Sequence, residues 1–193
     1  MKTVLTNVEC EIVLKNSRFI SMIFPLSNSD ISPLLQSVKV KYPDATHYCY
    51  AYIFQDIKHF SDDGEPGGTA GMPLMNVLEK KELTNVLLVC VRYFGGIKLG
   101  AGGLVRAYTK SATNLLNSLS LVELIDGYKI SITCSYNQQK TIDYLLRDDV
   151  ILSKDFQENV SYVALIPCSR MDSLTSFHPT ILNQQFVVKN KST

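Results

Sequence analysis

The uneven distribution of glycine is the feature that most constrains the fold of this chain of 193 residues. Nine of the ten glycines lie between Gly64 and Gly103, and the tenth is Gly127. Five of them fall within VRYFGGIKLGAGGLVRAY, residues 91–108, which follows the apolar run NVLLVCV. An apolar run, clustered glycines and then an amphipathic segment predict a buried strand, a tight loop and a helix.

This loop resembles phosphate-binding loops but matches neither of the two common motifs. A Walker A loop read from Gly95 requires lysine after its second glycine, and Ala101 stands there. A dinucleotide-binding motif read from Gly100 has Val105 where the third small residue belongs. The more general feature is the start of a helix with no Ser, Thr, Asp or Asn to cap it. Exposed amides and the helix dipole favour an anion there.

The charges around the loop fit an anion site. No acidic residue occurs between Glu82 and Glu123, although four basic residues lie in that interval. The alternative is a turn whose glycines allow positive φ and whose basic side chains are only solvated. Both interpretations remain open from the sequence. The candidate anion- or RNA-binding residues are Arg92, Gly95, Gly96, Lys98, Gly100, Gly102, Gly103, Arg106 and Lys110.

A second, acidic loop, SDDGEPGGTAG, covers residues 61–71 and holds Asp62, Asp63, Glu65 and Thr69. Dense carboxylates are ligands for Mg²⁺, which is bound by one or two of them together with substrate phosphate. The same residues also suit turns, which the sequence favours over a metal site. His47 opens an expected strand and is either a general base or a hydrogen-bonded structural histidine.

Composition limits the classes of protein that remain. The net charge is +1 and 46% of residues are hydrophobic, so a nucleic-acid partner requires a local basic patch. The amino terminus lacks a signal-peptide core, and the run Val86–Val91 is too short to cross a bilayer. We therefore expect a soluble, cytoplasmic protein with no membrane partner. The five cysteines form no CxxC pair, which argues against a zinc knuckle.

Hydrophobic periodicity predicts a two-domain α+β protein, with domains at 1–126 and 127–193 separated near LIDGYK. In the first domain we expect strands at 4–15, 18–26, 47–54 and 85–94, and helices at 27–42, 70–81 and 104–119. In the second we expect strands at 128–135, 150–156, 160–167 and 184–189, and helices at 137–147 and 170–177. This second order is βαββαβ, the ferredoxin-like pattern.

Four segments in order, KNSRF, ATHYCYAY, SDDGEPGGTAGMP and VRYFGGIKLGAGGLVRAY, resemble the YigZ/IMPACT family. The resemblance implies a first domain with the fold shared by RNase PH and the fourth domain of elongation factor G. It implies a ferredoxin-like second domain similar to the last domain of that factor. The family motif falls on Asp62, Asp63, Glu65, Gly67, Thr69, Gly71, Arg92, Tyr93, Gly95, Gly96, Gly100, Gly102, Gly103, Arg106 and Tyr108.

The resemblance also bears on function, because eukaryotic relatives regulate translation under amino-acid starvation through protein contacts. Our first hypothesis is a translation-associated regulatory protein that binds RNA or the ribosome through the glycine-rich basic loop. The second is an Mg²⁺-dependent phosphoryl-transfer enzyme acting on a nucleotide or RNA, and the third is a protein-docking regulator. We favour the first, with no catalytic residue, no required cofactor and no DNA sequence specificity.

Overall fold

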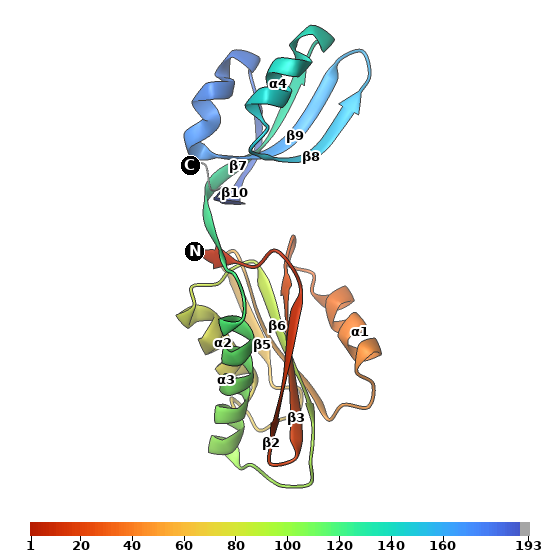
Figure 1. The fold of residues 1–193 in the computed structure, drawn as a ribbon, viewed down its shortest axis with the longest axis vertical. Helices are drawn as coiled ribbons and strands as arrows, with labels where there is room; N and C mark the ends of the chain where they lie inside the picture. Colours follow the sequence, from red (N-terminus) through yellow and green to blue (C-terminus); the bar gives the residue numbers. More distant parts are fainter. Residues whose placement is uncertain (190–193) are drawn as a thin grey trace. The chain divides into compact units, whose positions relative to one another are not determined.

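The structure is a computed structural model that describes residues 1–189, and the chain divides into two compact units (Figure 1). The units are Met1–Val122 and Glu123–Thr193, whereas the expected division lay between residues 126 and 127. Each unit contains an antiparallel sheet with helices packed on it. The mixed α+β class expected from the sequence is confirmed.

The amino-terminal unit is built on a five-stranded sheet in the order β2-β3-β6-β4-β5, with every neighbouring pair antiparallel. Its strands are β2 (Val8–Leu14), β3 (Ser17–Pro25), β4 (His47–Phe54), β5 (Ile57–Ser61) and β6 (Val86–Tyr93), and the short β1 (Lys2–Thr3) lies outside this sheet. The helices are α1 (Ser32–Lys41), α2 (Gly71–Lys80) and α3 (Ala101–Asn117).

Helices cover both faces of this sheet, with α1 on one face and α2 and α3 on the other (Figure 1). Strand β6 lies at the centre, and all its residues from Val86 to Arg92 are buried. Burial on both faces explains why this strand reads as a continuous apolar run instead of an alternating one. The amphipathic α3 buries Leu104, Tyr108 and Leu115 against the sheet, as expected.

One expectation for this unit is wrong, and the structure explains an alternation in the sequence of β4. The segment before the acidic loop forms strand β5, where we expected only a polar loop after Phe54. The three tyrosines Tyr48, Tyr50 and Tyr52 pack against the cluster beneath α1. Their alternation along β4 therefore reflects packing under a helix.

The second unit contains four main strands in the order β10-β7-β9-β8, all antiparallel. They are β7 (Val122–Cys134), β8 (Val150–Phe156), β9 (Val160–Pro167) and β10 (Thr180–Val188). Between them lie η1 (Tyr136–Gln138), α4 (Gln139–Leu145) and η2 (Cys168–Phe177). Helices α4 and η2 contribute Ile142 and Leu174 to one core with β7 and β9.

Three details of this unit differ from the sequence-based expectation. Strand β7 begins at Val122, so Gly127 lies inside a strand and pairs with Pro167 and Gln185. Element η2 is a 3₁₀ helix, and the helix expected at 137–147 is split into a 3₁₀ turn and α4. Within residues 1–189, none of the helices combines the length and apolar character needed to cross a membrane.

A buried ion pair in the second unit gives a pH-dependent prediction. The Asp149 side chain is 1% exposed, and Arg170 Nη1 lies 3.0 Å from its Oδ2. Burial raises the pKa of Asp149 to about 6, and Arg170 opposes that rise only in part. The folded-state pKa thus exceeds the unfolded value of about 3.9. Asp149 therefore stabilises the fold below about pH 4, and this contribution is lost as the pH rises through about 6.

We expect the stability of the wild type relative to Asp149→Asn to fall by on the order of 2 kcal/mol between pH 4 and pH 7. Urea unfolding of both proteins at the two pH values measures this change. Other carboxyl groups titrate equally in both proteins and cancel in the comparison. A stability difference that is independent of pH would contradict the prediction.

Candidate functional site

The acidic loop supplies a carboxylate that closes the amino terminus of α2. Asp62 Oδ1 accepts hydrogen bonds from the backbone N–H groups of Ala70 and Gly71 at 2.9 and 2.8 Å. Asp62 Oδ2 accepts a third from the N–H of Gly68 at 2.8 Å. An anion at this position satisfies helix amides that have no acceptor within the helix and interacts favourably with the helix dipole. Asp62 is thus an internal anion bound by α2.

Glu65, from the same loop, forms a buried ion pair with Arg92 at the end of β6. Arg92 Nη1 donates to Glu65 Oε1 at 2.6 Å, and the two side chains are 6% and 3% exposed. The Tyr108 hydroxyl on α3 donates to the same oxygen at 2.7 Å. Burial raises the pKa of Tyr108 well above its ordinary value, so this hydroxyl keeps its proton. The cluster joins the loop, the central strand and α3.

His47, the first residue of β4, completes this cluster. Its Nδ1 lies 2.8 Å from the carbonyl oxygen of Asp63, and a carbonyl only accepts, so Nδ1 carries the proton. In the neutral imidazole Nε2 is then an acceptor, and it lies 3.8 Å from Glu65 Oε2. Asp63 also holds the start of β4 in place, because its Oδ2 accepts a hydrogen bond from the N–H of Tyr48 at 2.6 Å.

The glycine-rich loop leads from β6 into α3 and leaves the start of that helix uncapped. Gly100 precedes the helix with φ 71°, a conformation that favours glycine. Because glycine has no side chain, it cannot accept a hydrogen bond from the first N–H groups of the helix. The first N–H to bond within the helix is that of Leu104, which donates to Gly100 O. In the described part of the chain, no group accepts from the N–H groups of Ala101, Gly102 and Gly103. The expectation of free amides is met here.

A hollow with a volume of about 460 Å³ lies beside this helix start. Arg92 lines it, and its buried Nε has no hydrogen-bond partner among the described residues. A buried polar group without a partner is uncommon and indicates a missing ligand or a strained site. The hollow is lined by Thr46, His47, Glu65, Pro66, Arg92, Phe94, Lys98, Leu99, Gly100, Ala101 and Leu104.

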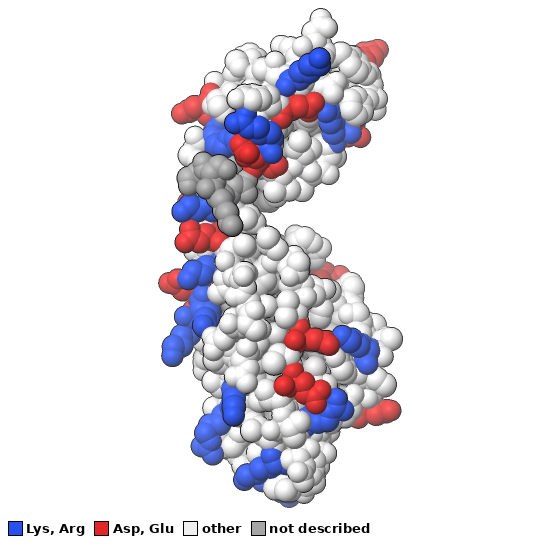
Figure 2. All heavy atoms as spheres, viewed as in Figure 1, with Lys and Arg blue, Asp and Glu red and all other residues white. Residues whose placement is uncertain are grey.

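Three basic side chains, one in the loop before α3 and two along that helix, have no acidic partner within residues 1–189. Lys98, Arg106 and Lys110 are all exposed, and none takes part in an ion pair or side-chain hydrogen bond there. Arg106 folds back along α3, since a Cβ at Gly102 would lie 3.6 Å from its Nη1. At the lower left of Figure 2, where α3 begins in Figure 1, Lys and Arg side chains lie without Asp or Glu among them.

The carboxylates of the acidic loop already have partners within the protein. Among residues 1–189 there is no group of three or more His, Cys, Asp or Glu side chains that could hold a metal ion. Asp62 is occupied by backbone N–H groups, and Glu65 is paired with Arg92. Thr69 has a turn role, because its hydroxyl donates to Pro66 O at 2.6 Å.

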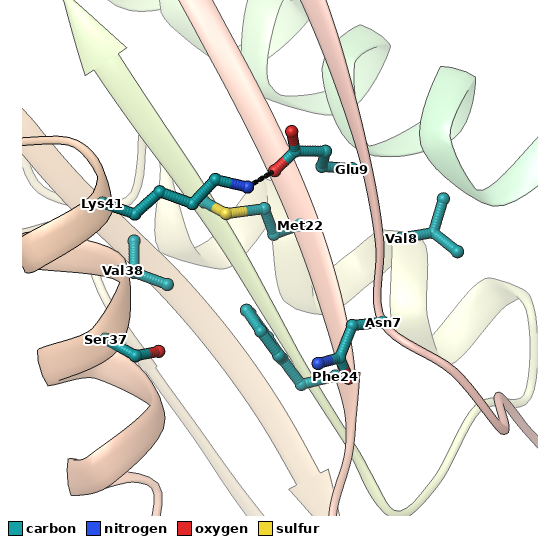
Figure 3. Close-up of a pocket in the computed structure, with 8 residues that line it drawn as sticks. All are labelled: Asn7, Val8, Glu9, Met22, Phe24, Ser37, Val38 and Lys41. Carbon is teal, nitrogen blue, oxygen red and sulfur yellow. Dashed lines mark hydrogen bonds and ion pairs between the residues drawn. The ribbon is translucent and has the colours of Figure 1, made fainter.

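Another hollow, of about 320 Å³, lies between α1 and strands β2 and β3 (Figure 3). Met22 and Phe24 form its floor, and the ion pair from Lys41 Nζ to Glu9 Oε2, at 2.5 Å, crosses it. Tyr42 also donates to Glu9, at 2.9 Å. The two charged groups of this hollow are thus paired with each other, and its remaining polar lining consists of Asn7 and Ser37.

Comparison with known proteins places this geometry in a family. Residues 15–116 match the family described as Impact N-terminal domain, and this range contains the whole candidate site. The chain belongs to the IMPACT family. IMPACT family member YvyE of Bacillus subtilis is 35% identical over 187 residues, covering 94% of this chain and 86% of that protein. IMPACT family member YigZ of Escherichia coli is 34% identical, covering 82% and 81%.

One solved structure shares the fold of this chain over nearly its whole length. The crystal structure of a hypothetical protein, 30% identical, matches with a TM-score of 0.64 and covers 98% of this chain and 97% of that one. The resemblance drawn from the four sequence segments is thereby confirmed.

The structure brings together only part of the residue set expected for the site. Glu65, His47, Arg92, Lys98 and Gly100 line one hollow. Gly95 and Gly96 shape the loop, and Arg106 and Lys110 lie along the exposed side of α3.

Sequence reasoning missed the roles of Tyr108 and Cys49. Tyr108 lies among the buried apolar residues of α3, and only its hydroxyl indicates a polar contact in the sequence. Cys49 lies 3.3 Å from that hydroxyl, and burial raises the pKa of its thiol. The sequence carries no signal for this contact.

Proposed function

We propose that this IMPACT family protein is a regulatory protein that binds RNA phosphates, on the ribosome or on free RNA, through the start of α3. The single observation that carries the proposal is the uncapped amino terminus of α3 beside the unpartnered, buried Nε of Arg92. The phosphate groups of RNA are anions of the kind that helix amino termini bind.

Helices α2 and α3, which lie on the same face of the sheet, differ at their amino termini, and this difference supports the proposal. At the start of α2, Asp62 accepts hydrogen bonds from three backbone N–H groups. The start of α3 has no such internal carboxylate, and its first turn contains no acidic residue. The free N–H groups at the start of α2 are therefore satisfied by a carboxylate of the protein itself, whereas those at the start of α3 are left for an external anion.

The basic side chains extend the anion site along α3. Arg106 and Lys110 are four residues apart and thus project from the same side of the helix. Since the net charge of the chain is only +1, binding of a polyanion would depend on this patch. We assign no sequence specificity for DNA, because phosphate contacts carry no sequence information.

A regulatory role agrees with the family resemblance better than catalysis does. The Mg²⁺-dependent alternative has less support, because Asp62 and Glu65 already have internal partners. The proposal includes a cytoplasmic location. It also includes a ferredoxin-like second unit, supported by the strand order β10-β7-β9-β8, and an RNase PH-like first unit, which rests on the resemblance.

Binding of a labelled 30-nucleotide single-stranded RNA at several salt concentrations tests the proposal. We expect the wild type to bind with a steep salt dependence, because phosphate contacts release counterions. The double substitution Arg106→Glu, Lys110→Glu should lower the affinity at least tenfold and reduce the salt slope by about 1–2.

The matched control is Lys80→Glu, Lys140→Glu, which changes the net charge equally. Lys80 is in the last turn of α2 and Lys140 is in α4, and both are exposed. This control should bind RNA almost as the wild type does. If the wild type does not bind at low salt, or if both double variants weaken binding equally, the patch on α3 is not an RNA site.

A further inference from the structure

We infer that the hollow beside α3 accepts one unstacked nucleotide, with its phosphate at the helix start and its base against Phe94. This inference rests on the proposed function and specifies what enters the site. It distinguishes a pocket for a single nucleotide from a surface that only attracts the phosphate backbone. The nucleotide that enters the hollow is either an unpaired nucleotide within RNA or a free nucleotide, and both present the same phosphate, ribose and base.

The lining of the hollow is divided between polar and apolar groups. One part presents the free amides at the helix start, Lys98 and the buried guanidinium of Arg92. The other part consists of Pro66, Leu99, Leu104 and the ring of Phe94. A phosphate suits the first part, and a planar, weakly hydrated base suits the second. The volume of about 460 Å³ falls within the range of small-molecule sites.

Phe94 is unusual in its surroundings because it is a large aromatic side chain left exposed at the end of a buried strand. It is 45% exposed, whereas the residues before it in β6 are almost all buried. Its backbone is held in place, since its N–H donates to Thr46 Oγ1 at 2.9 Å. Aromatic side chains beside a basic groove are the platforms on which unpaired bases stack.

Arg92 links the two parts of the hollow. Its guanidinium carbon lies 5.5 Å from the centre of the Phe94 ring, while its Nη1 is held by Glu65. The Nε atom is buried without a partner in the described residues, so its N–H is a donor that the ion pair with Glu65 does not use. This unpartnered donor is independent of the free helix amides, and both sets of donors suit the same anion.

His47 adds an acceptor to the lining of the hollow. Because its Nδ1 donates to Asp63 O, its Nε2 is an acceptor when the ring is neutral. A phosphate offers no hydrogen to such an acceptor at neutral pH, but a ribose hydroxyl or a base N–H does. The hollow therefore offers donors for a phosphate and an acceptor for the remainder of a nucleotide.

Ligand-observed NMR titration of the full chain with AMP, ribose 5-phosphate and inorganic phosphate tests the inference. We expect AMP to bind at least tenfold more tightly than ribose 5-phosphate, because only AMP carries a base that can stack. Phe94→Ala should abolish this difference, and Phe94→Tyr should retain it.

Ile97→Ala is the matched control, since Ile97 is also 45% exposed in the same loop but does not line the hollow. It should leave AMP binding unchanged. Circular dichroism of the variants shows whether each remains folded. Absence of AMP binding up to about 10 mM, or equal affinities for AMP and ribose 5-phosphate, would overturn the inference.

Single-stranded and duplex RNA separate this inference from the proposed function. Preference for the single strand, lost in Phe94→Ala, supports both. If both RNAs bind equally and Phe94→Ala has no effect, the nucleotide pocket is wrong while phosphate binding stands. If AMP binds through Phe94 but neither RNA binds, the RNA function fails and the hollow is a site for free nucleotides.

Discussion

Arg92→Met should lower the free energy of unfolding of the amino-terminal unit by about 3–5 kcal/mol, because it leaves Glu65 as a buried, unpaired charge. Arg92 is the cation bound to Glu65 Oε1, and the Glu65 side chain is 3% exposed. After the substitution, Glu65 would keep the hydrogen bond from Tyr108 and the longer contact with His47 Nε2 at 3.8 Å. Urea unfolding followed by far-UV circular dichroism measures the loss.

Two further variants separate the ion pair from simple packing. The double variant Arg92→Met, Glu65→Gln should regain stability relative to Arg92→Met, because the buried charge is then removed. Arg18→Met is the matched control, since Arg18 also pairs with a glutamate, Glu11, but is 49% exposed. Exposed pairs contribute little, so this control should cost a small fraction of the buried one. Equal losses at Arg18 and Arg92 would contradict the assigned role of the buried pair.

The elements of the fold were predictable where burial imposes a period on the sequence. Strand β6 was recognisable because both its faces are covered, which requires an apolar residue at every position. Helix α3 was recognisable from apolar residues three and four positions apart, and these face the sheet.

Strand β5 was missed because it lies at the edge of the sheet and carries little of that signal. Its residues are exposed or half-buried, and its sequence, IKHFS, contains only two apolar residues. The turn before it contains Gln55 at φ 53°, where Asn-Gly or Asp-Gly would have indicated a hairpin. The edge position and the unusual turn residue together concealed the strand.

The site was predictable only in part, because its decisive contacts join residues far apart in the sequence. The glycine pattern predicted the uncapped helix start, which depends only on neighbouring residues. The pairing of Glu65 with Arg92 spans 27 positions and depends on how the loop folds back onto β6. The sequence could not show the different roles of the three clustered acidic residues. Asp62 accepts hydrogen bonds from helix amides, Asp63 accepts one from the backbone of β4, and Glu65 is buried in an ion pair.

Gly95→Ala should destabilise the amino-terminal unit by at least about 3 kcal/mol and weaken binding at the hollow, because no space exists for its methyl group. A Cβ at this position would lie 2.0 Å from the carbonyl carbon of Asn16 and 2.5 Å from the N atom of Ser17. Both contacts are with backbone in the tight turn between β2 and β3, so no side chain can rotate away. Urea unfolding and RNA binding measure the two effects.

Gly67 in the acidic loop and Gly96 in the glycine-rich loop serve as controls, because each tests one reason for the presence of glycine. Gly67 has open space and an ordinary φ, so Gly67→Ala should change stability by less than about 0.5 kcal/mol. Gly96 also has open space but a φ of 83°, so Gly96→Ala should cost about 1–2 kcal/mol. If Gly95→Ala costs no more than Gly96→Ala, the turn between β2 and β3 yields to the added methyl group. The glycine-rich loop would then be held by its own conformation and not by its contact with that turn.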